Sequence, residues 1–309
     1  MKKDFLSFDA WSSKEITGLL DLADFFKKNP IGQDLLHQNW GLIFNKESTR
    51  TRVSFEVGIH QLGAQSLFLQ PNALQLGRGE TIADTARVLE RYLDGVVIRT
   101  YSHEEVEVFA KEARLCVING LTDLEHPCQI LADFMTIREK LGNLENKRIC
   151  YLGDGNNNMT RSMIAGAAKM GIFITIAAPN SLWPEKDFIT QQIKKSCHGA
   201  KFIDLTDNAV EAVQNADILY TDVWLSMGQK DETGEKLKLL KPFQINEKLF
   251  KHAPQHALFM HCLPAHREEE VTDFVLDHER SIVFDQAENR LHAQKAILKT
   301  VSKARKNER

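Results

Sequence analysis

The 309-residue sequence has few cysteines, almost no net charge and no long apolar run. Its five cysteines, Cys116, Cys128, Cys150, Cys197 and Cys262, include no Cys-x-x-Cys pair, which argues against a disulfide framework and against a structural zinc site. No stretch of about 18 apolar residues is available to span a membrane. The 39 basic and 42 acidic residues leave a net charge of -3, so we expect no general attraction to nucleic acid or to an anionic membrane.

The amino-terminal segment MKKDFLSFDAWSSKE carries charges where a signal peptide needs an apolar core. We therefore expect a cytoplasmic protein with reduced cysteines. Hydrophobic residues make up 43% and charged residues 26% of the chain, which is typical of a soluble globular protein. At roughly 150 residues per domain, the length predicts about two domains.

Short apolar or β-branched runs alternate with longer segments of helical period, such as residues 82–93. This alternation predicts the α/β class, with parallel sheets flanked by helices. A polar, turn-rich stretch at 140–147 precedes a new strand, and we place the domain boundary there. The predicted strands are 41–44, 66–69, 95–99, 115–118, 148–152, 173–177, 218–222, 258–260 and 281–284.

Ser48-Thr49-Arg50-Thr51 follows a predicted strand and precedes the helical run 53–62. Hydroxyl residues cap a helix start, where free N–H groups and the helix dipole favour an anion, and arginine adds forked donors. The segment therefore indicates a phosphate site, with an ordinary helix cap as the alternative. It lacks the glycines and the lysine of a nucleoside triphosphate loop.

His126-Pro127-Cys128-Gln129 also lies at a predicted helix start, where Pro127 suits the first turn. His126 and Gln129 are three residues apart, so both can face one site, polarise a carbonyl group and hold an amide. A capping histidine with a solvent-facing glutamine is the alternative.

Gly153-Asp154-Gly155 follows another predicted strand and matches the first two glycines of a dinucleotide-binding turn. Asn158 stands at the third glycine position, which makes this match weak.

Two further segments follow strands of the second half, at the sheet edge where open α/β sheets bind ligands. One runs from Asp222 to Gly228 and offers a carboxylate and the hydroxyl of Ser226, which suit a cationic amino acid. The other is His261-Cys262-Leu263-Pro264, which offers a thiol and a backbone carbonyl group. Adjacent histidine and cysteine are poorly arranged to bind one metal ion, and a buried structural cysteine is the alternative.

These motifs, in this order, resemble those of the transcarbamoylase family and, within it, the ornithine carbamoyltransferases. The segments LGRGETIADTARVLERY and SIVFDQAENRLHAQKAIL resemble the same family, so the likeness covers nearly the whole chain. One departure is the triple asparagine of GDGNNNM, where the family has an asparagine pair followed by an apolar residue. Met159 favours Asn157 and Asn158 as that pair, and either one can meet the substrate.

The resemblance implies transfer of the carbamoyl group of carbamoyl phosphate to the δ-amine of L-ornithine, giving L-citrulline and phosphate in arginine biosynthesis. It implies no metal and no organic cofactor. The carbamoyl phosphate contacts that match the family are Ser48, Thr49, Arg50, Thr51, Gln75, Arg99, His126, Pro127, Cys128, Gln129, Cys262, Leu263 and Arg290. The ornithine contacts that match are Asn157, Asn158, Asp222, Ser226 and Met227. Among these, Arg50, Arg99, His126 and Cys262 are the expected catalytic groups, and Cys262 or Asp222 assists loss of the amine proton.

The resemblance also implies two doubly wound α/β domains and a homotrimer in which a neighbouring subunit contributes to each site. We expect residues 1–142 to bind carbamoyl phosphate, residues 143–290 to bind ornithine, and a last helix at about 291–309 to pack on the first domain. A dehydrogenase, an amino-acid sensor and an aspartate-specific relative are weaker alternatives. A putrescine-specific relative is harder to separate, because putrescine also has a cationic end.

Overall fold

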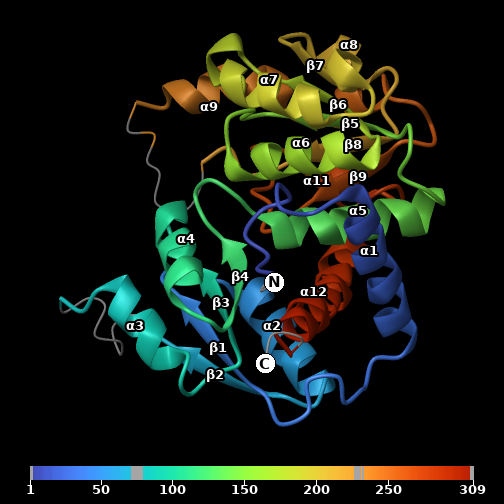
Figure 1. Cartoon of the computed structure of the whole chain (residues 1–309). Coiled ribbons are helices and arrows are strands. Elements are labelled where there is room, and N and C mark those ends of the chain that lie inside the picture. Colours follow the sequence, from blue (N-terminus) through green and yellow to red (C-terminus); the bar gives the residue numbers. More distant parts are fainter. Residues whose placement is uncertain (1–2, 71–78, 226–230, 232, 307–309) are drawn as a thin grey trace. The chain divides into compact units, whose positions relative to one another are not determined.

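The computed structural model describes residues 3–70, 79–225, 231 and 233–306 (Figure 1). The chain divides into two compact units. Unit 1 contains Met1–Met135 and Glu288–Arg309, and unit 2 contains Thr136–Ala287. Within the described residues, none of the helices combines the length and the apolar character needed to cross a bilayer.

Unit 1 is built on a parallel sheet of four strands, in the order β2-β1-β3-β4. The strands are β1 (Asn39–Phe44), β2 (Gln65–Leu69), β3 (Gly95–Arg99) and β4 (Cys116–Leu121). Strand β1 pairs with β2 on one side and with β3 on the other, so the strand order reverses between β1 and β3. Loops at the carboxyl ends of strands beside such a reversal are where doubly wound sheets bind ligands.

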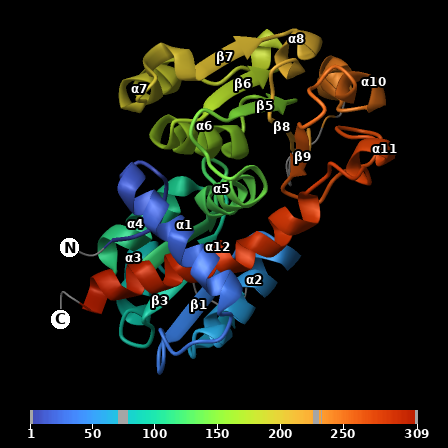
Figure 2. The ribbon, with the colours of Figure 1, turned by 90° about the vertical axis from the view of Figure 1, so that its right-hand side faces the viewer.

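The helices of unit 1 include one that returns from the end of the chain. Helix α12 (Val283–Lys306) lies beside α1 (Ser13–Lys28) and α2 (Thr49–Gln61) from residue 288 onward (Figure 2). Lys295 on α12 is fully buried and donates to the carbonyl oxygens of Phe26 and Pro30 and to Oε1 of Gln61. The other helices of this part of the chain are α3 (Ile82–Leu89), α4 (His103–Glu112) and α5 (Pro127–Leu141).

Unit 2 has a parallel sheet of five strands, in the order β7-β6-β5-β8-β9. Here the order reverses between β5 and β8. The strands are β5 (Arg148–Leu152), β6 (Phe173–Ala177), β7 (Ile203–Thr206), β8 (Ile218–Thr221) and β9 (Leu258–His261). The helices are α6 (Asn158–Met170), η3 (Asn180–Leu182), α7 (Lys186–Lys195), η4 (Gly199–Phe202), α8 (Ala209–Val213), α9 (Glu235–Leu240), η5 (Lys241–Phe243), α10 (Glu247–Phe250) and α11 (Asp273–Leu276).

The predicted fold class is confirmed, because both sheets are parallel and doubly wound. The strand predicted at 281–284 is wrong. Ser281 makes only an isolated bridge to Phe259, and the following residues begin α12, in which Phe284 is exposed. A run of three apolar residues fits the start of a helix as well as it fits a strand. Strand β7 was not predicted, because Asp204 interrupts its apolar residues.

The chain divides into the two units at residues other than the predicted domain boundary at 140–147. The first division falls between Met135 and Thr136, inside α5, and the second between Ala287 and Glu288, inside α12. A helix that continues through a division leaves no turn residues to mark it in the sequence.

Candidate functional site

The first candidate region, in unit 1, is the start of α2, directly after β1. Ser48 caps the helix, since its Oγ accepts from the backbone N–H of Thr51 at 3.1 Å. The first turn of α2 contains no acidic residue, and Arg50 is half-buried there. The free N–H groups of a helix start carry a partial positive charge, and Arg50 adds a full one. This end of α2 therefore favours an anion.

Two buried arginines converge on the same turn. Nη2 of Arg290, on α12, lies 2.5 Å from Oγ1 of Thr51, and Nη1 of Arg99, at the end of β3, lies 3.5 Å from that oxygen. Only 3% of Arg290 and 5% of Arg99 is exposed. Bringing two guanidinium groups together away from water is costly unless an anion offsets their charge. The arrangement thus suits a phosphate or a phosphate ester.

His126 shares this positive surrounding. Burial lowers the pKa of His126 well below its usual value, and the charges of Arg290 and Arg99 lower it further. The imidazole is therefore neutral at physiological pH. A neutral ring polarises a carbonyl oxygen by hydrogen bonding and adds no repulsion beside the arginines.

Gln129 lies one turn further along α5, which begins at Pro127 as predicted. Its Nε2 donates to Oδ1 of Asp133 at 2.8 Å, and this contact fixes which way the amide faces. Its Oε1 is buried and has no hydrogen-bond partner among the described residues. A buried acceptor of this kind suits a ligand N–H group.

Cys128 has a structural environment. Its thiol is fully buried and donates to the carbonyl oxygen of Asn119 at 3.2 Å, and burial raises its pKa to about 12. Its side chain therefore holds α5 to β4 and is no nucleophile.

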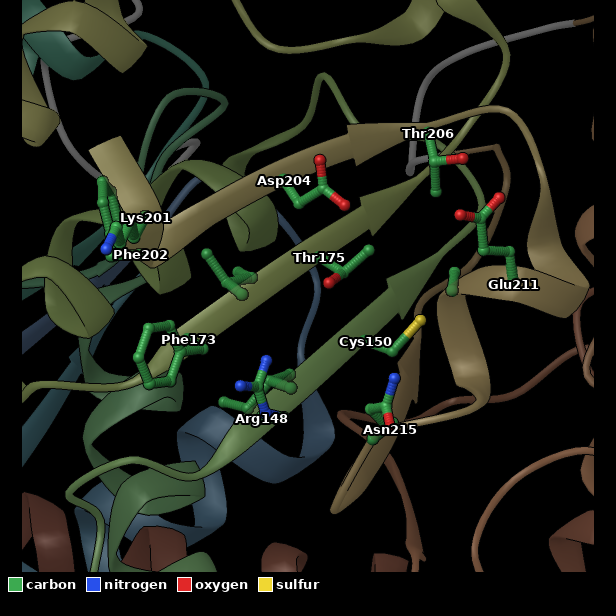
Figure 3. Close-up of a pocket in the computed structure, with 14 residues that line it drawn as sticks. Arg148, Cys150, Phe173, Thr175, Lys201, Phe202, Asp204, Thr206, Glu211 and Asn215 are labelled. Atoms are coloured by element: carbon green, nitrogen blue, oxygen red, sulfur yellow. The ribbon is translucent and has the colours of Figure 1, made fainter. Parts of the chain in front are cut away.

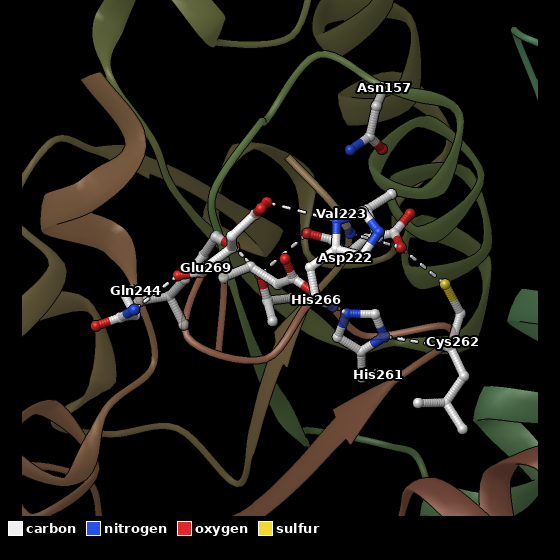
Figure 4. A network of polar contacts seen from close by, with 12 residues as sticks. Asn157, Asp222, Val223, Gln244, His261, Cys262, His266 and Glu269 are labelled. Carbon is white, nitrogen blue, oxygen red and sulfur yellow. Dashed lines mark hydrogen bonds and ion pairs between the residues drawn. The ribbon is translucent and has the colours of Figure 1, made fainter. Parts of the chain in front are cut away.

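The second candidate region, in unit 2, is formed by neighbouring strand ends. Thr221 of β8 pairs with His261 of β9, so the next residues of both strands, Asp222 and Cys262, lie side by side. Sγ of Cys262 donates to Oδ1 of Asp222 at 3.0 Å, and the backbone N–H of Val223 donates to the same oxygen at 2.8 Å (Figure 4). A carboxylate and a thiol are thus held as one hydrogen-bonded pair.

A buried chain of contacts orients the turn that carries Cys262. Nδ1 of His261 accepts from the backbone N–H of Leu263 at 2.9 Å, so the ring proton is on Nε2 and is donated to Oε1 of Glu270 at 3.1 Å. Both side chains are fully buried. Gln286 extends the chain, because its Oε1 accepts from the backbone N–H of His261 and its Nε2 donates to the hydroxyl of Tyr220.

Asn157 and Tyr151 complete this region. Asn157 caps α6, with its Oδ1 accepting from the backbone N–H of Thr160, and its Nδ2 donates to the Tyr151 hydroxyl at 2.8 Å. Burial raises the pKa of Tyr151 well above its usual value, and the negative charge of Asp222 raises it further. The phenol therefore remains protonated beside the carboxylate. Asn158, the first residue of α6, is half-buried.

Donor atoms of Asp222, His261 and Cys262 lie within 4.8 Å of one another, as do those of His266, Glu269 and Glu270. In the first group both ring nitrogens of His261 are used by Leu263 and Glu270. In the second, Glu270 is used by His261 and by the backbone N–H of His266. A metal ion at either group would have to displace these hydrogen bonds.

The predicted site residues divide between the units. Ser48, Thr51, Arg99, His126, Gln129 and Arg290 belong to unit 1, and Cys262, Leu263, Asn157 and Asp222 belong to unit 2. Gln75, Ser226 and Met227 lie outside the described residues. Sequence reasoning missed Tyr151, Glu270 and Gln286. In the sequence Tyr151 is indistinguishable from an ordinary strand residue. The only signal for Glu270 is the run of three glutamates, 268–270, that follows the His261 motif.

Comparison with known proteins assigns both halves of the chain to one family. The model for the carbamoyl-P binding domain of aspartate/ornithine carbamoyltransferases matches residues 3–139, and the model for the Asp/Orn binding domain matches residues 145–301. An ornithine carbamoyltransferase of Oceanobacillus iheyensis is 50% identical over 300 residues, which are 96% of this chain and 93% of that protein.

Solved structures agree with the sequence relatives. The ornithine carbamoyltransferase of Pyrococcus furiosus superimposes with a TM-score of 0.92 at 47% identity, over 96% of each chain. The anabolic ornithine carbamoyltransferase of Campylobacter jejuni superimposes with a TM-score of 0.91 at 37% identity, over 99% of this chain and 100% of that one.

Proposed function

The chain belongs to the aspartate/ornithine carbamoyltransferase family, and we propose how its residues divide the work of one reaction. It transfers the carbamoyl group of carbamoyl phosphate to the δ-amine of L-ornithine, which gives L-citrulline and phosphate. The observation that carries this conclusion is the match of both family domains, together with about 50% identity over nearly the whole chain.

The start of α2 and the two buried arginines of unit 1 bind the phosphate of carbamoyl phosphate. Arg50 and the hydroxyl residues Ser48, Thr49 and Thr51 contact its oxygens, and Arg99 and Arg290 offset its charge. The 2.5 Å contact of Arg290 with Thr51 supports this role, because it aims a guanidinium group at the helix start. Fixed cations also stabilise the negative charge that the leaving phosphate gains in the transition state.

His126 and Gln129 bind the carbamoyl group itself. The neutral imidazole donates to the carbonyl oxygen, on which negative charge develops as the amine attacks. Oε1 of Gln129 accepts from the carbamoyl NH2, and its lack of another partner among the described residues supports this role. Gln75, Pro127, Cys128, Cys262 and Leu263 remain further predicted contacts of carbamoyl phosphate.

The acceptor binds to unit 2. Asp222 pairs with the α-ammonium group of ornithine, and Asn157 or Asn158, with Ser226 and Met227, completes the contacts. Asn157 has its amide committed to the cap of α6 and to Tyr151. It therefore acts through Tyr151 and the helix cap, and Asn158 is the other candidate for the substrate contact.

The attacking amine must lose a proton, because a primary amine has a pKa near about 10.4 and only its neutral form is nucleophilic. The 3.0 Å contact between Cys262 and Asp222 supports a joint role for the two groups. The first proton leaves the ammonium group toward this pair. The amine lone pair then forms the new C–N bond, the bond from carbon to the phosphate oxygen breaks, and a second proton passes from the attacking nitrogen to the departing phosphate.

A colorimetric citrulline assay with ornithine, putrescine and aspartate as rival acceptors tests the acceptor. We expect ornithine to be the preferred acceptor. Asp222 would repel the second carboxylate of aspartate, whereas putrescine also has a cationic end and is separated from ornithine by the measured kcat/KM. Higher kcat/KM with putrescine or aspartate would contradict the assignment.

The alternative of a nicotinamide-dependent enzyme rested on Gly153 and Gly155, and that support is lost. An added Cβ on Gly153 would lie 3.1 Å from Nε1 of Trp224, and one on Gly155 would lie 2.7 Å from the carbonyl oxygen of Leu182. Close packing therefore accounts for both glycines without a dinucleotide.

The homotrimer, the cytoplasmic location and the biosynthetic direction also belong to this proposal. Large apolar side chains exposed on unit 1 support a partner surface. They include Val53, Val57, Leu67, Val88 and Tyr92. The Campylobacter jejuni relative is called anabolic, which supports a role in arginine biosynthesis.

A further inference from the structure

A polar recess of about 200 Å³ lies on the sheet of unit 2 (Figure 3), and none of the residues assigned to catalysis lines it. Its walls come from one face of β5, β6 and β7, where Cys150, Thr175 and Asp204 are neighbours across the three strands. Arg148 and Phe173 form the preceding row, and Thr206 lies in the following one.

The recess is open because the covering helix is short. Helix α8 has five residues, and its Ala209 and Val213 pack on Cys150 in the core. Thr175, Asp204 and Thr206, on the two outer strands, stay half-buried or exposed. In a doubly wound sheet both faces are normally covered by helices, so an open, polar portion is unusual.

The charges in the recess are separated along the strand direction. Arg148 and Lys201 lie toward the amino ends of the strands, whereas Asp204 and Glu211 lie further along (Figure 3). The Arg148 guanidinium lies 4.7 Å from the centre of the Phe173 ring, which orients it. The side chains of Lys201 and Asp204 have no hydrogen bond or ion pair within the described ranges, so they are available to a ligand.

We propose that this recess binds an ω-amino acid, with its carboxylate at Arg148 and Lys201 and its terminal cation at Asp204 and Glu211. The row of Asp204 lies two residues beyond the row of Arg148 and Phe173, which is about 7 Å along the strand direction. Strand β6 separates β5 from β7, so the long side chains of Arg148, Lys201 and Glu211 have to reach over it to meet one ligand. An extended carbon chain of four or so methylene groups, as in δ-aminovalerate or the side chain of a basic amino acid, spans a comparable length. A phosphate ester would be repelled by the two carboxylates, and a polyamine by the two cations.

Calorimetric titration of the whole enzyme with δ-aminovalerate tests this site. The probe has no α-ammonium group, which is the group that Asp222 is proposed to bind, so the acceptor site is not its target. We expect saturable binding, weakened at least about tenfold in Asp204→Asn and in Lys201→Gln, because each variant removes one charge-assisted contact. Valerate and pentylamine, which each lack one charged end, should bind at least about tenfold more weakly than the probe.

Asp187→Asn and Lys194→Gln, two exposed positions on α7 outside the recess, are the matched controls and should keep the parent affinity. All four variants should keep the parent rate of citrulline formation without the probe, which separates this site from the catalytic one. Absence of saturable binding would overturn the proposal. So would equal binding of valerate or pentylamine, or binding that survives the recess variants and is lost in Asp222→Asn.

Discussion

Thr51 is a single hydroxyl on which two buried arginines converge, and Arg50 lies one residue away. Arg99 and Arg290 are almost fully buried. Arg50 is half-buried at the helix start. Its guanidinium group is therefore the one whose removal should damage catalysis with the least damage to the core.

We expect Arg50→Ala to lower kcat about 100-fold to 1,000-fold, which corresponds to about 2.7–4 kcal/mol for a lost donor to developing charge. Arg114→Ala, which removes an exposed arginine at the other end of the sheet, is the control and should leave the rate unchanged. Steady-state citrulline formation measures both. Near-parent turnover in Arg50→Ala would remove the phosphate role of this helix start.

Asp222 accepts from two donors at one oxygen, the thiol of Cys262 and the backbone N–H of Val223. In Asp222→Asn an oxygen remains for these donors, but the charge that attracts an α-ammonium group is lost. The loss of a charge-assisted contact of about 1.5–3 kcal/mol should lower kcat/KM for ornithine about tenfold or more.

Carbamoyl phosphate binding is the internal control for this variant, because its proposed phosphate contacts lie in unit 1. Calorimetry should give the parent affinity for carbamoyl phosphate. Equal loss of both ligands would mean that Asp222 is structural, and normal ornithine kinetics would mean that the amino acid binds elsewhere.

The pH dependence of kcat/KM for ornithine should reflect protonation of the substrate amine and not protonation of His126. Burial and the neighbouring arginines keep the pKa of His126 below its usual value, so it is already neutral from about pH 6.5 upward. The fraction of neutral δ-amine still rises through this range. We expect kcat/KM for ornithine to rise from about pH 6.5 to about pH 9.

His126→Gln should lower kcat/KM at every pH and keep the slope of its pH profile. A pH profile of kcat/KM that becomes flat in the variant would assign the titration to His126.

The depressed pKa of His126 also has a consequence for folding. Below the usual pKa of 6.5 the unfolded chain binds a proton that the folded chain does not, so the free energy of unfolding falls as the pH drops. That part of the acid sensitivity should be absent in His126→Gln.

At the scale of the element, the turn after β5 depends on one glycine. Gly153 has φ of +125°, and an added Cβ would meet the indole of buried Trp224 at 3.1 Å. We expect Gly153→Ala to lower the free energy of unfolding by about 1–3 kcal/mol, since backbone and packing both oppose it. Chemical denaturation measures the change.

Gly18 offers a matched control with the opposite sign. It is exposed within α1, and nothing lies within 4 Å of an added Cβ. Gly18→Ala should raise the free energy of unfolding by about 0.5–1 kcal/mol, because alanine favours the helix. A Gly153→Ala variant as stable as the parent would mean that Trp224 moves aside easily.

Elements with a strong local pattern could be predicted from the sequence, and those set by neighbours could not. Eight of the predicted strands correspond to β1–β6, β8 and β9, because each is a short apolar run bounded by polar residues. Residues 281–284 have the same pattern, but Ser281 makes only an isolated bridge and Val283 begins α12. Strand β7 pairs only with β6 at the sheet edge, and its polar Asp204 hides it in the sequence.

The same distinction applies to the sites. Motif residues such as Ser48 and Asp222 could be found because chemistry requires certain residue types together in sequence. Tyr151 and Gln286 could not be found in this way. They reach the site through pairing of β5 with β8 and through a contact between His261 and a residue 25 positions later. Such contacts follow from topology rather than from local sequence.

For the whole molecule, the charge is close to balanced, yet Arg50, Arg99 and Arg290 are gathered in one unit. Anion binding therefore needs no basic protein, only a local group of cations held away from water. The net charge of -3 instead leaves the surface without strong repulsion between copies, which is compatible with assembly.

The proposed homotrimer should depend on the exposed apolar side chains of unit 1. Val53 and Val57 lie one turn apart on α2, which packs beside β2, where Leu67 is also exposed. We expect the parent to have three times the 35.2 kDa of one chain in sedimentation or light scattering. Val53→Lys with Val57→Lys should shift the mass toward one chain, because charged side chains are costly to bury in an interface. Val210→Lys, at an exposed valine of unit 2, is the matched control and should keep the parent mass.

Because a neighbouring subunit is expected to contribute to each site, the dissociated variant should also lose most citrulline formation. An unchanged mass would place the interface elsewhere, and full activity of a single chain would mean that each site is complete without its neighbour.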